Sequence, residues 1–218
     1  MKILMVSSFL PYPLLNGGNI RLYNLLKHLS KIHEITLICE KRDYQKQNDI
    51  EEIEKLCRKV ITVDRKKQWS IANILKTAFS LESFLIVGHT SLELKRAIAE
   101  ELEKEKYDLI HVETSYVMQN LPKVNIPIVL VEHNVEYLVY GRYARQAPIF
   151  LRPFLLIDVW KLKLAERSFW KKATKLIAVS KIEKDIIGAS EVIPNGADVE
   201  KFKVQSYGGK DDIVYWRF

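Results

Sequence analysis

Two adjacent glycines stand where a ligand with negative charge could approach the backbone. Gly17 and Gly18 end the loop 7–18, which follows an apolar run at 2–6 and precedes an amphipathic segment that reaches residue 29. Backbone amides at the N-terminus of a helix bind anions, and glycine has no Cβ to obstruct the ligand. An ordinary turn between a strand and a helix would use the same residues. The pattern therefore predicts either a phosphate-binding loop or a plain turn.

A histidine follows another apolar run in a comparable position. His133 stands between Glu132 and Asn134, directly after residues 128–131. An imidazole there can donate a hydrogen bond to a sugar hydroxyl or a phosphate oxygen, or stabilise a charge that develops in a reaction. The alternative is a histidine that caps the turn between a strand and a helix. We favour the functional interpretation of His133.

The other histidines and the cysteines are not expected to take part in chemistry. His111 lies within a predicted strand and is interpreted as a core residue whose hydrogen bonds are satisfied. Cys39 and Cys57 lack the spacing of metal ligands and are expected to be reduced thiols in or near the core. Three further histidines have no chemical neighbours in the sequence and are interpreted as surface residues: His28, His33 and His89.

The elements that position these residues follow an alternating pattern. Apolar runs rich in β-branched residues recur between amphipathic segments, which is typical of a parallel sheet connected by helices. The predicted strands are 2–6, 35–40, 60–64, 109–113, 128–132, 176–179 and 192–193. The predicted helices are 18–30, 47–58, 71–79, 91–104, 135–145, 153–172 and 181–187, with a turn at 115–121. The predicted fold class is α/β, a Rossmann-like, doubly wound parallel sheet with helices on both faces.

Polar residues and glycines follow the ends of several predicted strands. Besides the glycine loop, they occupy residues 113–116, 132–137, 180–181 and 194–198. The carboxyl ends of parallel strands meet at one edge of the sheet, where open α/β sheets bind their ligands. The sequence therefore predicts a ligand-binding crevice at this edge.

Composition limits the class of protein. With 218 residues, 48% of them hydrophobic, the chain can bury a core, which excludes a disordered chain. The net charge of +7 favours an anionic partner, but the basic residues are dispersed and form no recognised nucleic-acid-binding module, so nucleic acid is not predicted as a partner. No apolar stretch is long enough to span a bilayer, and the N-terminus does not resemble a signal peptide. We expect a cytoplasmic location.

Several nucleotide-binding and catalytic motifs are absent from the sequence. It contains no Asp-x-Asp pair for a metal on a nucleotide diphosphate, no P-loop and no G-x-G-x-x-G motif. It also lacks a nucleophile elbow around Ser7, Ser8 or Ser180. The sequence therefore disfavours a dehydrogenase, a hydrolase and a metal-dependent transferase.

Four segments together resemble the N-terminal half of a GT-B glycosyltransferase, specifically of glycosyltransferase family 4. They are strand 2–6 with its glycine loop, the turn Glu132-His133-Asn134, the run 178–181, and the string 192–198 followed by Phe202, in which Pro-Asn-Gly-x-Asp succeeds an apolar pair. The resemblance covers nearly the whole chain. It implies a retaining transferase of the hexosyltransferase type, which moves a sugar from a nucleotide-diphosphate donor to a glycan or lipid-linked acceptor without a bound metal or other cofactor.

The resemblance also implies roles for individual residues. Gly17 and Gly18 would lie near the donor diphosphate and the transferred sugar, and His133 would contact that sugar as the catalytic residue. Four residues are expected on the acceptor or sugar-binding side: Tyr12, Ser115, Tyr116 and Asn134. Three residues near the interdomain crossover are expected to be structural: Asn195, Gly196 in a turn with positive φ, and Asp198 as a cap.

The resemblance further implies a division into domains. Residues 1–204 would form the N-terminal, acceptor-side domain, and residues 205–218 a linker and the first strand of a C-terminal domain. The family's basic donor-phosphate pair and its Glu-x7-Glu motif belong to that second domain, so the 218-residue chain alone is expected to fold but not to transfer sugar. Two alternatives stay open: a non-catalytic Rossmann-like domain that binds a nucleotide or sugar phosphate, and an inverting GT-B relative.

The predicted helix 153–172 has two notable faces. Leu155, Val159, Leu162 and Phe169 share one face and are expected to pack on the sheet, which would leave Glu166 on the same face in need of a polar partner. The adjacent face combines apolar anchors with basic residues: Leu156, Trp160, Lys163, Arg167 and Lys171. This face suits peripheral contact with the inner side of an anionic membrane. The alternative is a solvated basic face whose Leu156 and Trp160 pack against neighbouring loops.

Overall fold

Strand β1 (Lys2–Ser7) lies inside the sheet and pairs in parallel with β2 (Glu34–Lys41) and β4 (Leu109–Glu113). The computed structural model describes residues 1–196, in which the sheet has seven strands in the order β3-β2-β1-β4-β5-β6-β7, all pairs parallel. The chain winds outward from β1 to β3, returns to β4 and winds outward again, which confirms the predicted doubly wound fold. The remaining strands are β3 (Lys59–Asp64), β5 (Ile128–Glu132), β6 (Lys175–Ala178) and β7 (Glu191–Val192).

Two predictions concern residues outside this range. Asp198 and the boundary at residue 204, with the linker and strand predicted after it, lie beyond the described residues. The division into domains therefore stays a prediction.

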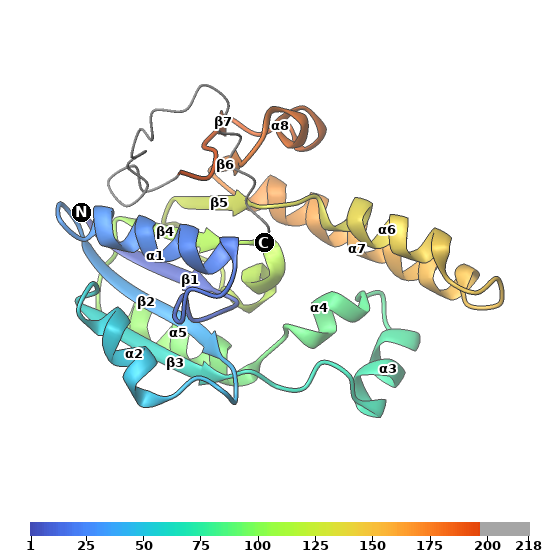
Figure 1. The fold of residues 1–218 in the computed structure, drawn as a ribbon, viewed down its shortest axis with the longest axis horizontal. Coiled ribbons are helices and arrows are strands. Elements are labelled where there is room, and N and C mark those ends of the chain that lie inside the picture. Colours follow the sequence, from blue (N-terminus) through green and yellow to red (C-terminus); the bar gives the residue numbers. More distant parts are fainter. Residues whose placement is uncertain (197–218) are drawn as a thin grey trace, which may run out of the picture.

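Helices connect the strands and cover both faces of the sheet (Figure 1). They are α1 (Gly17–Leu29), α2 (Gln47–Glu54), α3 (Ile71–Ala78), α4 (Phe84–Gly88), α5 (Leu92–Lys104), the 3₁₀ helix η1 (Ser115–Asn120), α6 (Glu136–Gln146), α7 (Arg152–Lys172) and α8 (Lys181–Ile187). The prediction missed α4, because five apolar residues are too few to show a helical period. It also extended α2 to residue 58, whereas the helix ends at Glu54. The backbone N–H of Arg58 instead donates to the carbonyl of Ile35 in β2.

The hydrophobic core has two parts, one on each face of the sheet. Leu4 and Val6 of β1 belong to one cluster, with α5 and η1, whereas Met5 belongs to the other, with α1 and α2. Successive side chains of a strand point to opposite faces, so a strand that is apolar throughout must be covered on both sides. Cys39 and Cys57 are buried free thiols in the second cluster, as predicted.

Helices α6 and α7 form an antiparallel hairpin that projects past the carboxyl ends of the strands (Figure 1). Leu162 and Phe169 of α7 join the core as predicted. Val159 instead faces α6, where its Cγ1 would lie 3.8 Å from a Cβ on Gly141. A helix of 21 residues is about 30 Å long and therefore extends beyond the sheet that it covers. Among the described residues, no helix combines the length and apolarity that crossing a membrane requires.

Candidate functional site

A cavity of about 300 Å³ opens at the carboxyl edge of the sheet, where the winding reverses between β1 and β4. Loops from both halves of the fold contribute to it. Its wall includes Gly18 of the glycine loop, Thr114 and Tyr116 after β4, and His133, Asn134 and Glu136 after β5. This is the edge at which open α/β sheets bind ligands, and at which the sequence predicts a crevice.

A buried carboxylate, Glu113 at the end of β4, organises the floor of this site. Its Oε1 lies 2.6 Å from Nε2 of His133 and its Oε2 lies 2.8 Å from Nε2 of His111. Burial alone would raise the pKa of Glu113, but the hydrogen bonds from His111 and His133 outweigh it and hold the pKa at about 2. Glu113 is therefore an anion, and both imidazoles donate to it. Nε of Arg21 adds a positive charge 3.5 Å from Oε1.

The hydrogen bond to Glu113 fixes which ring nitrogen of His133 meets a ligand. An ionised carboxylate can only accept, so Nε2 of His133 carries a proton. The opposite nitrogen, Nδ1, points toward the glycine loop: a Cβ built on Gly18 would lie 3.9 Å from it. His133 thus lines the cavity with Nδ1 free to hydrogen-bond a ligand there.

The glycine loop meets the cavity at Gly18. Asn16 caps α1, because its Oδ1 accepts from the N–H of Asn19 at 3.0 Å. A Cβ on Gly18 would lie 3.3 Å from Asn16 Oδ1 and 3.6 Å from the ring of Phe9, while a Cβ on Gly17 would meet nothing within 4 Å. Neither glycine has a positive φ, so Gly18 provides space rather than an unusual backbone conformation.

Gln45, which the sequence analysis did not single out, holds the glycine loop in place. Its Nε2 donates to the carbonyls of Leu10, at 3.1 Å, and of Tyr12. Asn19 supports the same loop by donating to the carbonyl of Pro13 at 2.9 Å. Gln45 lies after β2, so only the folded sheet brings it beside a loop that follows β1.

The four residues predicted on the acceptor side divide into two pairs. Tyr116 and Asn134 line the cavity. Tyr12 instead packs its ring against Tyr23, with 6.1 Å between the ring centroids. Ser115 is buried, and its backbone N–H donates to Oε2 of Glu132 at 3.2 Å. The structure thus brings two of these residues to the cavity wall and uses the other two for packing.

Thr114 has an unusual backbone conformation directly beside the cavity. Its φ of 72° and ψ of 145° lie in a region that residues with a Cβ rarely adopt. Such strain typically costs about 1–3 kcal/mol and persists where the surrounding structure enforces it. The backbone N–H of Thr114 donates to the carbonyl of Val131 at 2.9 Å, and its hydroxyl lies 3.4 Å from that of Ser8.

The interpretation of His89 as a surface residue is wrong. Its side chain is buried and stacks on Tyr116, with ring centroids 4.8 Å apart. Nε2 lies 2.9 Å from Nη2 of Arg65, and Nδ1 lies 3.5 Å from Oε2 of Glu40. A guanidinium only donates, so Nε2 of His89 accepts, and burial lowers the pKa of His89 in agreement with a neutral ring. Helix α4, which the sequence analysis missed, carries His89 into the interior.

Two arginines form a cationic end of the cavity. Arg42 and Arg65 line it from the loops after β2 and β3. Burial lowers the pKa of Arg65, and the charge of Arg42 lowers it further. The clustered positive charge favours an anionic group on the ligand. The sequence offered no signal for this pair, because the two residues lie in separate loops.

The crossover residues are held by Arg21, which the sequence analysis also missed. Nη1 of Arg21 donates to the carbonyls of Ile193 and Pro194, each at 3.2 Å, and to Oδ1 of Asn195 at 3.0 Å. Asn195 is thus anchored through its side chain, and its structural role stays a prediction. The turn with positive φ predicted at Gly196 is wrong, because φ at Gly196 lies outside that region. Arg21 holds residues 193–195 through their oxygen atoms, and in this arrangement the chain continues without a positive φ at Gly196.

Glu166 has the polar partners that its predicted burial required. Its two carboxylate oxygens accept from the backbone N–H groups of Glu136, at 2.9 Å, and Tyr137, at 2.8 Å, at the start of α6. Burial, together with the charge of Glu132, raises the pKa of Glu166 to about 8. Burial also raises the pKa of Glu132 to about 7. Glu166 thus joins the two helices of the hairpin, and Glu132 joins the hairpin to the sheet because its Oε1 accepts from Nε1 of Trp170 at 2.8 Å.

The site is rich in histidine and glutamate, whose side chains can be metal ligands. Among residues 1–196, no three His, Cys, Asp or Glu side chains are arranged to share a metal ion. Reaction without a metal stays a prediction.

The fold is that of a Rossmann-like domain, with a cavity at its switch point. Residues 15–201 match the family model of Glycosyltransferase Family 4. The match contains Gly18, Glu113 and His133, and it covers most of the chain. The chain therefore belongs to Glycosyltransferase Family 4.

Individual relatives are more distant. The chain is 26% identical over 190 residues to a Klebsiella pneumoniae protein described as "Uncharacterized 44.6 kDa protein in cps region". The match covers 84% of this chain and 47% of that protein. The chain thus spans about half the length of this curated relative. Among solved structures, it is similar to the N-terminal domain of trehalose-6-phosphate phosphatase from Candida albicans, with a TM-score of 0.44, 16% identity, and coverage of 92% of this chain and 49% of that one. It is also similar to a ugt transferase from Siraitia grosvenorii in complex with UDP, with a TM-score of 0.43, 7% identity, and coverage of 86% and 46%.

Proposed function

We propose that this chain is the acceptor-side domain of a retaining, metal-independent glycosyltransferase that uses a nucleotide-diphosphate sugar. The observation that carries the proposal is the placement of His133, whose Nδ1 faces the cavity beside Gly18 while Nε2 is held by the buried anion of Glu113. Membership of Glycosyltransferase Family 4 supports the class of reaction.

The geometry suits a sugar whose anomeric carbon becomes positive as the diphosphate leaves. His133 would hydrogen-bond a sugar hydroxyl through Nδ1, and Glu113 would keep its imidazole oriented and electron-rich. A fixed dipole of this kind stabilises developing charge more in the transition state than in the bound substrate. The first-turn amides of α1, at Gly17 and Gly18, would face the diphosphate. Further cations for the leaving group would come from a C-terminal domain.

The acceptor would occupy the opposite end of the cavity. Tyr116, Asn134 and Glu136 provide hydrogen-bonding groups for hydroxyls, and Arg42 and Arg65 provide positive charge. This combination fits a glycan or a lipid-linked acceptor that carries phosphate. We propose no cofactor and no nucleic-acid partner.

Kinetics on the full-length enzyme test the proposal. A panel of purified nucleotide-diphosphate sugars identifies the donor, and His133→Ala is then compared with His28→Ala, an exposed histidine of α1. We expect His133→Ala to lower kcat by about 10²-fold or more and to lower Tm modestly, because the buried carboxylate of Glu113 loses one of its partners, while His28→Ala changes neither. Normal turnover with a lowered Tm would instead assign His133 to a structural cap. Binding of a nucleotide or sugar phosphate without any transfer would favour the non-catalytic alternative.

A further inference from the structure

Helix α3 exposes an apolar face that the fold does not cover. None of its residues is buried, although Ile71, Ile74 and Leu75 follow the spacing of one helical face. Residues next to α3 are equally exposed: Trp69, Phe79 and Leu81 are 79%, 89% and 84% exposed. An amphipathic helix without buried residues gains nothing from the core. Its apolar face needs another explanation.

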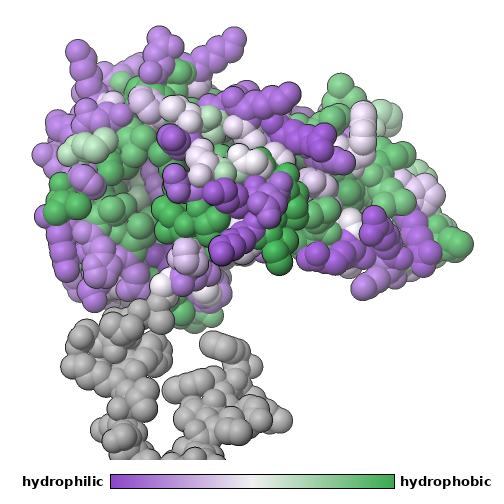
Figure 2. Space-filling view, turned by 90° about the horizontal axis from the view of Figure 1, so that it is seen from above, coloured by the Kyte–Doolittle hydropathy of each residue, from purple (hydrophilic) through white to green (hydrophobic). Residues whose placement is uncertain are grey.

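The far end of the α6–α7 hairpin also exposes apolar side chains. Ile149, Phe150 and Phe154 are 70–77% exposed. Leu156 and Trp160 are also exposed, so they do not pack against neighbouring loops as the alternative in the sequence analysis required. Figure 2 shows apolar side chains on the surface of the projecting arm.

Two contacts tie α3 and the hairpin together. Nζ of Lys161 in α7 donates to the carbonyl of Thr77 in α3 at 2.7 Å. Oδ1 of Asp158 accepts from the backbone N–H of Phe84, at the start of α4, at 2.8 Å. Both parts project from the same end of the molecule (Figure 1). We call residues 69–81 and 149–160 together the projecting surface.

Charge around the projecting surface is strongly biased. Residues 65–81 contain four basic residues and no acidic one, although Lys66 and Lys76 form ion pairs with Glu93 and Glu82. Residues 137–165 contain five basic residues and one acidic one, Asp158. That single carboxylate is the one that accepts from Phe84. The chain as a whole has 34 basic and 27 acidic residues, so the bias is local. Exposed aromatic and aliphatic side chains amid basic residues match the interface of an anionic bilayer.

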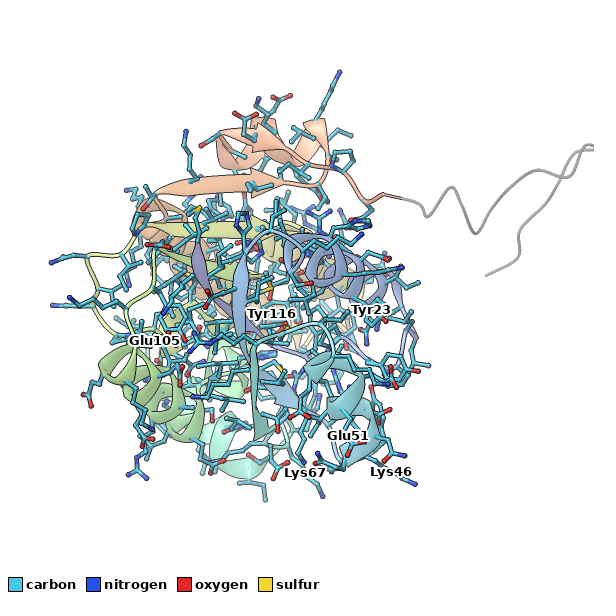
Figure 3. All side chains as sticks on the ribbon, turned by 90° about the vertical axis from the view of Figure 1, so that its left-hand side faces the viewer. Tyr23, Lys46, Glu51, Lys67, Glu105 and Tyr116 are labelled. Atoms are coloured by element: carbon cyan, nitrogen blue, oxygen red, sulfur yellow. The ribbon has the colours of Figure 1, made fainter. Side chains whose placement is uncertain are left out.

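A groove connects the projecting surface to the cavity. It has a volume of about 460 Å³, shares Arg42, Tyr44 and Arg65 with the cavity, and ends at Trp69. Lys67 also lines this groove, and it lies at the rim of the molecule in Figure 3, while Tyr116 of the cavity lies well inside the outline. The groove therefore extends from the candidate site to Trp69, at the edge of the exposed apolar residues.

We propose that the projecting surface docks on a membrane leaflet that contains anionic lipid. Trp69, Phe79, Phe150 and Phe154 enter the headgroup region, and the surrounding lysines and arginines contact lipid phosphates. This inference goes beyond the proposed function and does not depend on it, because a chain without transferase activity would present the same surface.

Flotation with vesicles tests the docking. The 218-residue chain is mixed with vesicles of phosphatidylcholine alone, or of phosphatidylcholine with phosphatidylglycerol. We expect binding to the anionic vesicles only, with a loss of binding at high salt. Absence of binding, or equal binding to both kinds of vesicle, would overturn the proposal.

Matched variants locate the contact. Ile71→Ser with Ile149→Ser removes two apolar side chains from the projecting surface, and Ile32→Ser with Ile182→Ser removes two of similar exposure elsewhere. Lys67→Glu with Arg145→Glu is matched in net charge by Lys31→Glu with Arg96→Glu. For Ile71→Ser with Ile149→Ser, and for Lys67→Glu with Arg145→Glu, we expect the partition coefficient between vesicle and water to fall about fivefold or more per altered site. The two control variants should change it little. Equal loss in variant and control would refute a localised contact, and Tm values would confirm that all four double variants fold.

Two other partners that could cover the projecting surface would give different experimental results. If a second copy covers this surface, sedimentation velocity will show a dimer that Ile71→Ser with Ile149→Ser dissociates, in the absence of lipid. If a further domain of the full-length protein covers it, the 218-residue chain will bind vesicles and the full-length protein will not. Either result would overturn the proposal.

Discussion

Glu113 and His133 are joined at the candidate site by a short hydrogen bond, with 2.6 Å between Oε1 and Nε2. The carboxylate is fully buried, and a second imidazole, that of His111, occupies its other oxygen. This pair determines the orientation of His133 and leaves only Nδ1 to meet a ligand. The relationship leads directly to a test of the site.

Replacing Glu113 by Gln should damage activity through His133. The amide keeps the shape but can no longer accept from both imidazoles, so the proton on His133 is free to move to Nδ1. We expect kcat of the full-length enzyme to fall about 10²-fold, with a stability loss of about 1–3 kcal/mol from the unpaired buried groups. Steady-state kinetics and urea unfolding measure the two effects.

His111→Gln is the control, because it removes the other partner of the same carboxylate. We expect a comparable stability loss and a much smaller change in kcat. Equal effects on kcat would mean that Glu113 acts on general stability rather than on His133.

A side chain at Gly18 should obstruct the ligand, whereas one at Gly17 should not. A Cβ at Gly18 lies toward His133 and within 3.3 Å of Asn16, while a Cβ at Gly17 meets open space. We therefore expect Gly18→Val to weaken donor binding about tenfold or more, and Gly17→Val to leave it unchanged. Isothermal titration of the full-length enzyme with its donor measures both. Unchanged affinity in Gly18→Val would remove the loop from the site.

Thr114→Gly should remove backbone strain. With φ at 72°, the threonine costs about 1–3 kcal/mol, and glycine adopts this conformation without penalty. We expect Tm to be maintained or to rise, despite loss of the contact with Ser8. Thr62→Gly in β3, at an ordinary strand position, should instead lower stability by about 1 kcal/mol. Equal losses in both variants would show that Thr114 is not strained.

Stability should decline between about pH 4.5 and pH 8. Burial raises the pKa of Glu132 from 4.5 to about 7 and of Glu166 from 4.5 to about 8, so the folded chain binds more protons than the unfolded chain between these values. Stability therefore falls as pH rises, by about 1.4 kcal/mol per pH unit for each group that is protonated only in the folded state, until both groups are ionised in both states. Thermal unfolding measured across this range should show a lower Tm at the alkaline end.

Glu166→Gln identifies the group responsible. An amide does not titrate, so the variant should show a flatter decline over the same pH range. A slope equal to that of the unmodified chain would assign the pH dependence elsewhere. Below pH 4.5 the opposite sign applies to Glu113: its pKa of about 2 means that stability is lost as its carboxylate protonates.

The sequence by itself determined the layered sheet and the place of the candidate site. Strands that are apolar on both faces require helices on both sides, and the carboxyl ends of parallel strands meet at one edge. These two rules located Gly18, Tyr116, Asn134 and His133 near one another before their distances were known. Helical spacing likewise placed Glu166 among apolar residues and predicted that it needs polar partners.

Only the tertiary structure decided the electrostatics of the site. The charge state of Glu113 depends on one imidazole from its own strand and another from the loop after the neighbouring strand, and no sequence spacing specifies that the second one reaches it. His89 looked like a surface residue until α4 carried it between Arg65 and Glu40. Local periodicity reports which face of an element is apolar. Hydrogen bonds, burial and pKa values depend on which elements pack together, and packing is a property of the whole chain.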